Sequence, residues 1–187
     1  QDVPGYLFDT EGFLLLSLAA HGPGQGEVVE IGSFMGRSTC WLAAGLAQAG
    51  RGKVTAIDTF QGSPEHQGDE RLRAIIEQGG LLAGFRENLR KHGLLEHAVP
   101  VQGDSQEVVR TWERPIRLLF IDGDHSYEGV CRDFIAWERF VVPGGVVALH
   151  DVGVWDDVTR FYAANMRRNK RYRESAGVDS LRSFVKL

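Results

Sequence analysis

The sequence predicts an α/β fold: a doubly wound, mostly parallel sheet with helices on both faces. Five short apolar runs alternate with longer stretches of helical spacing, which is typical of repeated strand–helix units. Several of these runs end directly in a glycine or an acid, as expected at the edge where such sheets bind ligands. Residues 172–187 read as two further strands joined near Asp179. The expected sheet therefore has about seven strands, five parallel and then a C-terminal antiparallel hairpin.

The length of 187 residues fits one domain, expected to span residues 1–187. The formal net charge of −4 lacks the positive bias typical of nucleic-acid binding, so no nucleic-acid partner is expected. No apolar run reaches membrane-spanning length, so no membrane partner is expected either. The two cysteines have no metal-site or disulfide spacing, which favours a reducing compartment and predicts a cytoplasmic protein.

Residues 1–26 are expected to form an N-terminal helical segment. Thr10 is a favourable N-cap residue, and apolar residues recur after it with helical spacing. The run Gly22-Pro23-Gly24 is expected to end this helix.

The central stretch of the chain, Glu27–Leu42, predicts a strand, a tight loop with Gly32 and Gly36, and a helix. Glu30 offers a carboxylate, which suits a ribose hydroxyl or a cationic amine better than a phosphate. The spacing E-x-G-x-x-x-G also departs from the dinucleotide fingerprint G-x-G-x-x-G, with Phe34 at the middle glycine. A nucleoside with a zwitterionic amino-acid tail therefore fits better than a diphosphate, and a tight turn without a ligand is the alternative.

The second strand is expected at Lys53–Ile57, with Asp58 placed to accept from two ribose hydroxyls. Residues 61–80 form a polar insertion with a short helix expected at 70–78, and they are a candidate lid. The later elements are expected to be a helix at 82–92, a strand at 99–101, a helix at 106–112, a strand at 117–121, a helix at 127–140, a turn at 143–145, a strand at 146–149 and a helix at 155–168.

Polar side chains follow the fourth and fifth expected strands. Asp122, Asp124 and His125 come directly after the most apolar strand, and His150 and Asp151 follow the next one. Such groups at the end of a buried strand are costly unless they are hydrogen-bonded or bind a metal. The sequence therefore predicts chemistry at this edge of the sheet.

At these motifs the sequence resembles class I S-adenosylmethionine-dependent methyltransferases. The run E-I-G-x-x-x-G-x-S from Glu30 to Ser38 resembles the first motif of the cation-dependent O-methyltransferases of the catechol and caffeoyl-CoA type. The run D-T-F-Q-G from Asp58 to Gly62 resembles a segment of macrocin- and novobiocin-type sugar O-methyltransferases. The resemblance implies a Rossmann-like fold and S-adenosylmethionine as the methyl donor. It implies donor binding by Glu30, Gly32, Ser33, Gly36, Ser38, Asp58, Thr59, Asp104, Ser105 and Asp122.

Asp104 carries two interpretations. In the families that the sequence resembles, an acid at this place accepts from the adenine amine, and the next residue, here Ser105, lies beside the ring. Asp104 is also suited to cap the following helix, and Asp58 has the same alternative. We expect the adenine role for Asp104 and keep the helix cap as the alternative.

The resemblance also implies a reaction site. Cation-dependent members have an Asp after the fourth strand and an Asp–Asn pair after the fifth, so Asp122, His150 and Asp151 are the expected metal ligands, for Mg or Mn. His150 departs from that pattern, which leaves the need for a divalent cation open. Without a metal, Asp122 would fix the tail of the donor and His150 would act directly on the acceptor. His125 stands where the catechol type has a lysine base and titrates near neutral pH, with a helix-capping role as its alternative. The expected catalytic residues are His125, Asp122 and His150.

The sequence thus predicts an enzyme that transfers a methyl group from S-adenosylmethionine to a hydroxyl group of a small-molecule acceptor. Two alternatives stay open: a non-catalytic S-adenosylmethionine-binding module and a nicotinamide-dependent oxidoreductase. Glu30 before the first glycine and the missing middle glycine oppose the oxidoreductase. A homodimer is the expected oligomeric state.

Overall fold

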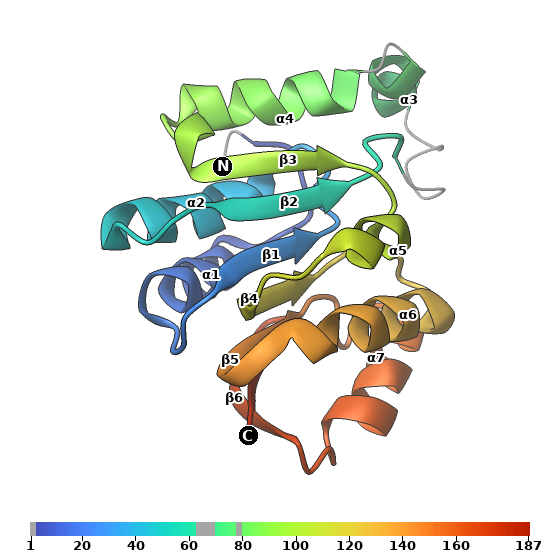
Figure 1. The fold of residues 1–187 in the computed structure, drawn as a ribbon. Coiled ribbons are helices and arrows are strands. Elements are labelled where there is room, and N and C mark those ends of the chain that lie inside the picture. The colour runs from blue at the N-terminus through green and yellow to red at the C-terminus, as the bar shows by residue number, and fades with distance from the viewer. Residues whose placement is uncertain (1–2, 63–69, 78–79) are drawn as a thin grey trace.

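The computed structural model describes residues 3–62, 70–77 and 80–187 (Figure 1). Its sheet has seven strands in the order β3-β2-β1-β4-β5-β7-β6. Strands β1 to β5 pair in parallel, and β7 pairs antiparallel with both β5 and β6. This confirms the predicted sheet and its C-terminal hairpin. The strands are β1 Glu27–Ile31, β2 Val54–Asp58, β3 Ala98–Gln102, β4 Ile116–Ile121, β5 Val141–Leu149, β6 Tyr172–Val178 and β7 Leu181–Lys186.

Helices pack on both faces of the sheet, as the doubly wound prediction requires (Figure 1). Helices α1, α2 and α4 bury apolar side chains on one face, and α6 and α7 do so on the other. The α-helices are α1 Asp9–His21, α2 Arg37–Ala49, α3 Glu70–Glu77, α4 Gly80–Lys91, α5 Ser105–Val108, α6 Tyr127–Trp137 and α7 Asp156–Phe161. Short 3₁₀ segments are η2 Leu95–His97, η3 Val109–Thr111 and η4 Glu138–Phe140, and η5 Tyr162–Met166 is π-helical.

The central strands explain why both faces are covered. Neighbouring residues on β4, Leu118 and Leu119, point to opposite faces and belong to different apolar clusters, and Val28 and Val29 on β1 do the same. Every residue of β4 is buried. A strand that is apolar on both sides has to lie inside a sheet with helices above and below.

Two local predictions were wrong. The N-cap of α1 is Phe8, not Thr10, because the side chain of Glu11 accepts a hydrogen bond from the Phe8 amide at 2.9 Å and so starts the helix earlier. The expected turn at 143–145 lies inside β5, which begins at Val141. The pairing of β5 with β4 is irregular between Ile116 and Leu118. The residues of the expected turn are therefore extra residues of β5 within this irregular part of the sheet.

The candidate lid at 61–80 falls partly outside the described residues, since 63–69 and 78–79 are not among them. Within it, the expected short helix is present as α3. Among the described residues, no helix combines the length and the apolar character that a membrane span requires.

Candidate active site

One large cavity lies along the edge where the parallel strands end. Its volume is about 1370 Å³, larger than the roughly 300–1,000 Å³ that pockets for a single small ligand usually have. The residues that follow β1, β2, β3, β4 and β5 all contribute to its wall. Among the predicted site residues, the wall includes Gly32, Ser33, Ser38, Asp58, Thr59, Asp104, Ser105, Asp122, His125, His150 and Asp151.

The glycine loop after β1 has a conformation that favours glycine. Gly32 has φ of +84°, and a Cβ atom there would lie 2.1 Å from the carbonyl oxygen of Asp122. Gly36 is the left-handed N-cap of α2 with φ of +87°, and a Cβ atom there would lie 3.0 Å from the ring of Phe85. The loop can therefore run close beside the end of β4, and this brings Gly32 next to Asp122.

Asp58 fixes this loop from the neighbouring strand. Its Oδ2 accepts hydrogen bonds from the amides of Ser33 and Phe34, both at 2.8 Å, and its Oδ1 accepts from the amide of Phe60 at 2.6 Å. Phe34 is held at a positive φ of 44°, which is uncommon for a residue with a side chain. The carboxylate predicted for ribose thus also shapes the loop. Its Oδ2 already accepts two hydrogen bonds, whereas Oδ1 accepts one and keeps a second lone pair for a ligand.

Glu30 lies below the loop. It is fully buried, and its carboxylate contacts the hydroxyl of Thr39 in the first turn of α2. Burial raises the pKa of Glu30 to about 7, although the hydroxyls of Ser38, Thr39 and Ser33 oppose the shift. Ser38 is buried beside it. The structure therefore places Glu30 behind the wall of the cavity, whereas the sequence suggested direct contact with the ligand.

The stretch after β3 contributes a capped helix start. Asp104 is the N-cap of α5 and accepts from the amide of Gln106 at 2.7 Å. The hydroxyl of Ser105 donates to Asp133 on α6. Thr59, which follows the neighbouring β2, accepts through its carbonyl from the side chain of Gln102 at 3.2 Å. The capping interaction expected as the alternative for Asp104 is therefore present, and its carboxylate still lines the cavity.

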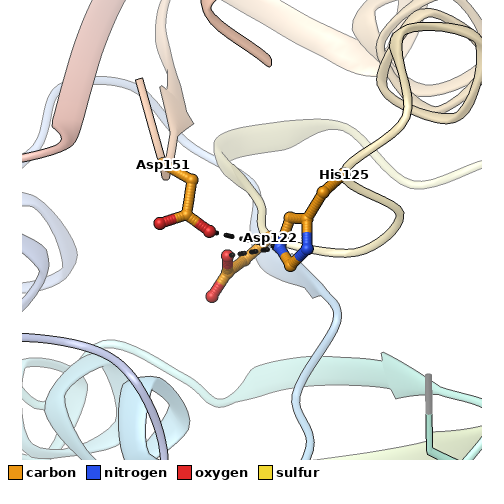
Figure 2. A group of neighbouring side chains, drawn as sticks. All are labelled: Asp122, His125 and Asp151. Atoms are coloured by element: carbon orange, nitrogen blue, oxygen red, sulfur yellow. Dashed lines mark ion pairs between the residues drawn. The ribbon is translucent and has the colours of Figure 1, made fainter. Parts of the chain in front are cut away.

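Asp122, His125 and Asp151 form a group of neighbouring ionisable side chains in the cavity that could hold a metal ion (Figure 2). Candidate ligand atoms of the three lie within 4.8 Å of one another. His125 Nε2 is 3.2 Å from Asp151 Oδ2 and 3.9 Å from Asp122 Oδ1. Burial works against a charged His125, but the two carboxylates prevail and raise its pKa to about 10. His125 also stacks on Trp155, with ring centroids 5.0 Å apart.

Asp151 is held in an unusual backbone conformation, with φ of +63°. Residues other than glycine rarely adopt this region, and such strain is concentrated at functional sites. Burial would raise the pKa of the Asp151 carboxyl, but His125 and His150 hold it well below its usual range. The carboxylate is therefore ionised and points toward His125 (Figure 2).

His150 lies behind this group. It is 3% exposed, and both ring nitrogens face carboxylates: Nδ1 is 2.9 Å from Asp122 Oδ1, and Nε2 is 3.0 Å from Glu11 Oε2. Burial opposes its charge, but Asp122, Asp151 and Glu11 raise the pKa of His150 to about 12. The structure brings the predicted ligands Asp122 and Asp151 together with His125, and it places His150 as their support.

Glu11 is the functional candidate that sequence reasoning missed. It lies on α1 and is fully buried, far along the chain from its partners His150 and Ser180. Burial would raise the pKa of Glu11, but hydrogen bonds from His150, Ser180 and the Phe8 amide lower it to about 2. An acid in the first turn of a helix ordinarily indicates an exposed residue that favours the helix dipole. The structure shows that the start of α1 is closely packed, since a Cβ atom at the neighbouring Gly12 would lie 2.3 Å from Trp41, but no local pattern in the sequence indicates this.

The segment before α1 forms another part of the wall, and Arg37 holds it there. Arg37 donates to the carbonyls of Leu7 at 2.7 Å and Val3 at 3.0 Å, and it pairs with Asp9 at 3.1 Å. Tyr6 and Phe8, which also line the cavity, are 74% and 61% exposed. One arginine thus joins the start of α2, beside the glycine loop, to the N-terminal segment.

The sequence and fold match those of known methyltransferases. The family described as a methyltransferase domain matches residues 29–152, more than half of the chain, so the chain belongs to this methyltransferase family. A protein of Mycobacterium sp. (strain JLS), provisionally named an O-methyltransferase, is 31% identical over 137 residues, which are 73% of this chain and 53% of that protein. The chain spans about half the length of the curated relatives it matches first.

Solved structures show the same fold. Cofactor-bound Rv0187 from MTB superposes with a TM-score of 0.71 at 22% identity, covering 99% of this chain and 84% of that one. The O-methyltransferase from Bacillus cereus, solved in complex with SAH, superposes with a TM-score of 0.65 at 20% identity, covering 99% of this chain and 85% of that one. At these identities the likeness establishes the Rossmann-like methyltransferase fold.

Proposed function

We propose that this protein transfers a methyl group from S-adenosylmethionine to a hydroxyl oxygen of a small molecule. The observation that carries the proposal is the convergence of five strand ends on one cavity that has a glycine loop on one side and Asp122, His125 and Asp151 on the other. The cavity has room for a nucleoside donor and a small acceptor together. The family and the SAH complex of the Bacillus cereus relative support the same donor.

The donor is proposed to lie along the glycine loop. Gly32 allows a close approach of the backbone, Gly36 supports the loop through its left-handed conformation at the start of α2, and Ser33 borders the cavity. Asp58 can accept from a ribose hydroxyl through the remaining lone pair of Oδ1. Asp122 would face the amino-acid tail. The other predicted donor-binding residues keep that role as proposals, with Asp104, Ser105 and Thr59 on the adenine and ribose side and Glu30 and Ser38 supporting the loop from below.

S-adenosylmethionine supplies an already activated methyl group, so the protein has mainly to position both partners and accept one proton. The carbon–sulfur bond breaks as a bond to the acceptor oxygen forms, and the hydroxyl proton is proposed to pass to His125. Asp151 orients His125 through their 3.2 Å contact, and Trp155 holds the imidazole plane by stacking. Asp122 and Asp151 favour the charged form of His125, so in the reaction without a metal it can take the proton once the acceptor engages these carboxylates.

A divalent cation fits the same residues. Asp122, Asp151 and His125 offer two carboxylate oxygens and one imidazole nitrogen within 4.8 Å, which is a suitable donor set for Mn, and the carboxylates also suit Mg. When bound, such a cation lowers the pKa of a coordinated hydroxyl group. We propose His125 as the third ligand candidate beside the predicted His150, since His150 is buried with both nitrogens engaged. With a cation bound, His125 would serve as a ligand, and its role as the base belongs to the reaction without a metal. The same engagement weighs against His150 acting directly on the acceptor.

The proposal is tested by turnover. The protein is incubated with S-adenosylmethionine and a panel of sugars, phenols and other hydroxylated acceptors, and release of S-adenosylhomocysteine is measured. Formation of a methyl ether on at least one acceptor is expected. Donor binding without turnover on any acceptor would instead favour the non-catalytic binding module. Repeating the assay after thorough chelation, then with Mg or Mn restored, decides the metal part separately.

Several other expectations remain predictions. These are a single domain over residues 1–187, a lid within residues 61–80, a homodimer, a cytoplasmic location, and a small-molecule acceptor with no nucleic-acid partner. Sedimentation of the purified protein tests the dimer directly.

A further inference from the structure

Glu11 joins three parts of the fold that are distant in sequence. Its Oε1 accepts from the amide and hydroxyl of Ser180, at 2.9 and 2.6 Å, in the turn between β6 and β7. Its Oε2 accepts from the amide of Phe8 at 2.9 Å and lies 3.0 Å from Nε2 of His150, just after β5. Four partners around a carboxylate that is fully buried compensate the loss of water, which otherwise costs several kcal/mol.

The contact with His150 continues to the reaction site. The opposite ring nitrogen, Nδ1, lies 2.9 Å from Asp122 Oδ1 and 3.4 Å from Asp151 Oδ1. An imidazole held from both sides cannot rotate, so its position fixes the two carboxylates that it contacts. Partners behind a ligating or catalytic carboxylate ordinarily set its orientation.

We propose that Glu11 is a positioning residue that acts through His150 on Asp122 and Asp151, an inference that rests on the methyltransferase function proposed above. The two oxygens of Glu11 have separate tasks. Oε1 fastens α1 to the β6–β7 turn, while Oε2 holds the imidazole of His150. The fastening does not depend on Glu11 alone, because the neighbouring Thr10 hydroxyl bonds to Asp179 in the same turn. The structural and the positioning contributions can therefore be separated by mutation.

The kinetic test compares Glu11→Gln with Thr10→Ala. The glutamine keeps the size of the side chain and loses its charge, so we expect kcat to fall about 10- to 100-fold. The KM of the donor and its affinity by calorimetry should change much less than kcat, because Asp122 is the one proposed donor-binding residue that contacts His150. Thr10→Ala removes an exposed tie between the same two segments and should leave kcat unchanged. An unchanged kcat in Glu11→Gln overturns the proposal and leaves Glu11 a purely structural residue.

A double-mutant cycle identifies the route of the effect. If Glu11 acts through His150, Glu11→Gln should cause no further loss of kcat in a His150→Asn background. Independent, multiplying losses would contradict the route through His150. Should Glu11→Gln fail to fold, Glu11→Asp, which keeps the charge but shortens the reach, is measured in the same cycle.

A spectroscopic readout separates this inference from the proposed function. The side-chain nitrogen and proton resonances of His150 are recorded for the wild-type protein, Glu11→Gln and Thr10→Ala, without donor or metal. We expect a shifted and broadened Nε2 signal in Glu11→Gln alone, since only that variant releases the ring. An inactive wild-type protein with this pattern would reject the methyltransferase function and keep the Glu11–His150 link. An unchanged His150 spectrum in Glu11→Gln would reject the link itself.

Discussion

Glu30 shows how a single buried carboxyl group makes stability depend on pH. Its pKa is raised from 4.5 to about 7 in the folded protein, so folding favours the protonated form. The stabilisation from this protonated form is complete below pH 4.5 and is lost as the pH rises through 7. Asp122 and Cys40 are the titratable groups that interact with Glu30, and Asp122 raises its pKa further. Because one pKa unit corresponds to about 1.4 kcal/mol, ionisation of the buried carboxyl lowers the free energy of unfolding by about 3 kcal/mol at high pH.

Glu30→Gln removes this dependence, because the amide stays neutral at every pH. We expect the variant and the wild-type protein to be equally stable at pH 5, with the variant more stable by about 2–3 kcal/mol at pH 8. Denaturant unfolding at four pH values between 5 and 8 measures the difference. The exposed Glu96→Gln is the matched control and should follow the wild-type curve. A stability difference that does not change with pH would show that Glu30 is ionised throughout.

His125 is the residue that takes the proton in the reaction proposed above. We expect His125→Ala to lower kcat by about 10²- to 10⁴-fold, the usual contribution of a positioned acid or base. Donor affinity, measured by calorimetry, should remain within threefold, because the glycine loop and Asp58 are untouched. Partial recovery of kcat by added imidazole would support the role as a base. The exposed His92→Ala serves as the control, and equal effects of both variants would rule out a special role for His125.

At the scale of elements, the segment before α1 depends on one side chain for its position. Arg37 donates to two carbonyls of this segment, those of Val3 and Leu7, and pairs with the carboxylate of Asp9, the first residue of α1. If each hydrogen bond contributes a net gain of about 1 kcal/mol, the free energy of local opening of this segment is raised by about 2–3 kcal/mol. The segment is therefore held over the cavity by the first residue of α2.

Arg37→Met should release the segment. We expect chymotrypsin to cleave after Tyr6 or Phe8 about 30- to 100-fold faster than in the wild-type protein, since cleavage follows the population of the open form. Arg51→Met is the matched control, because Arg51 makes comparable bonds to the carbonyls of Ala20, Gly22 and Gly24 at the other end of α1. If both variants are cleaved equally fast, the segment does not depend on Arg37.

The elements that sequence reasoning predicted well have strong local patterns. The apolar run before Asp122 and the glycine pair Gly32 and Gly36 are visible within a few residues, and the structure places them as predicted. The failures come from long-range contacts. Thr10 is not the N-cap because Glu11 accepts a hydrogen bond from the Phe8 amide. Glu11 itself is buried because residues after β5 and in the β6–β7 turn contact it. No local pattern reveals such partners.

The site was predicted in outline and differs in its pairing. Asp122 and Asp151 were expected to meet because the ends of parallel strands lie at one edge, and they do. Which histidine joins them depended on side-chain direction: His150 turns inward to Glu11, and His125 turns toward the cavity from the loop before α6. That choice is made by tertiary packing, so spacing alone could not supply it.

At the scale of the whole molecule, donor binding should be visible as thermal stabilisation. A ligand at about 100 times its Kd stabilises the folded state by about 2.7 kcal/mol. For a chain of this size we expect S-adenosylmethionine or S-adenosylhomocysteine to raise the Tm by about 5–10 °C. Reduced nicotinamide dinucleotide at the same concentration should leave the Tm unchanged. The reverse pattern would favour the oxidoreductase alternative.

The bond between Glu11 and Ser180 also constrains biosynthesis. During translation Glu11 is synthesised long before Ser180. Burial of its carboxylate is therefore compensated by hydrogen bonds only after Ser180 has been synthesised. The glycine loop after β1 is held by Asp58, which is synthesised much earlier than Ser180. A nascent chain halted before the final hairpin could thus form that loop while Glu11 and His150 still lack their final arrangement.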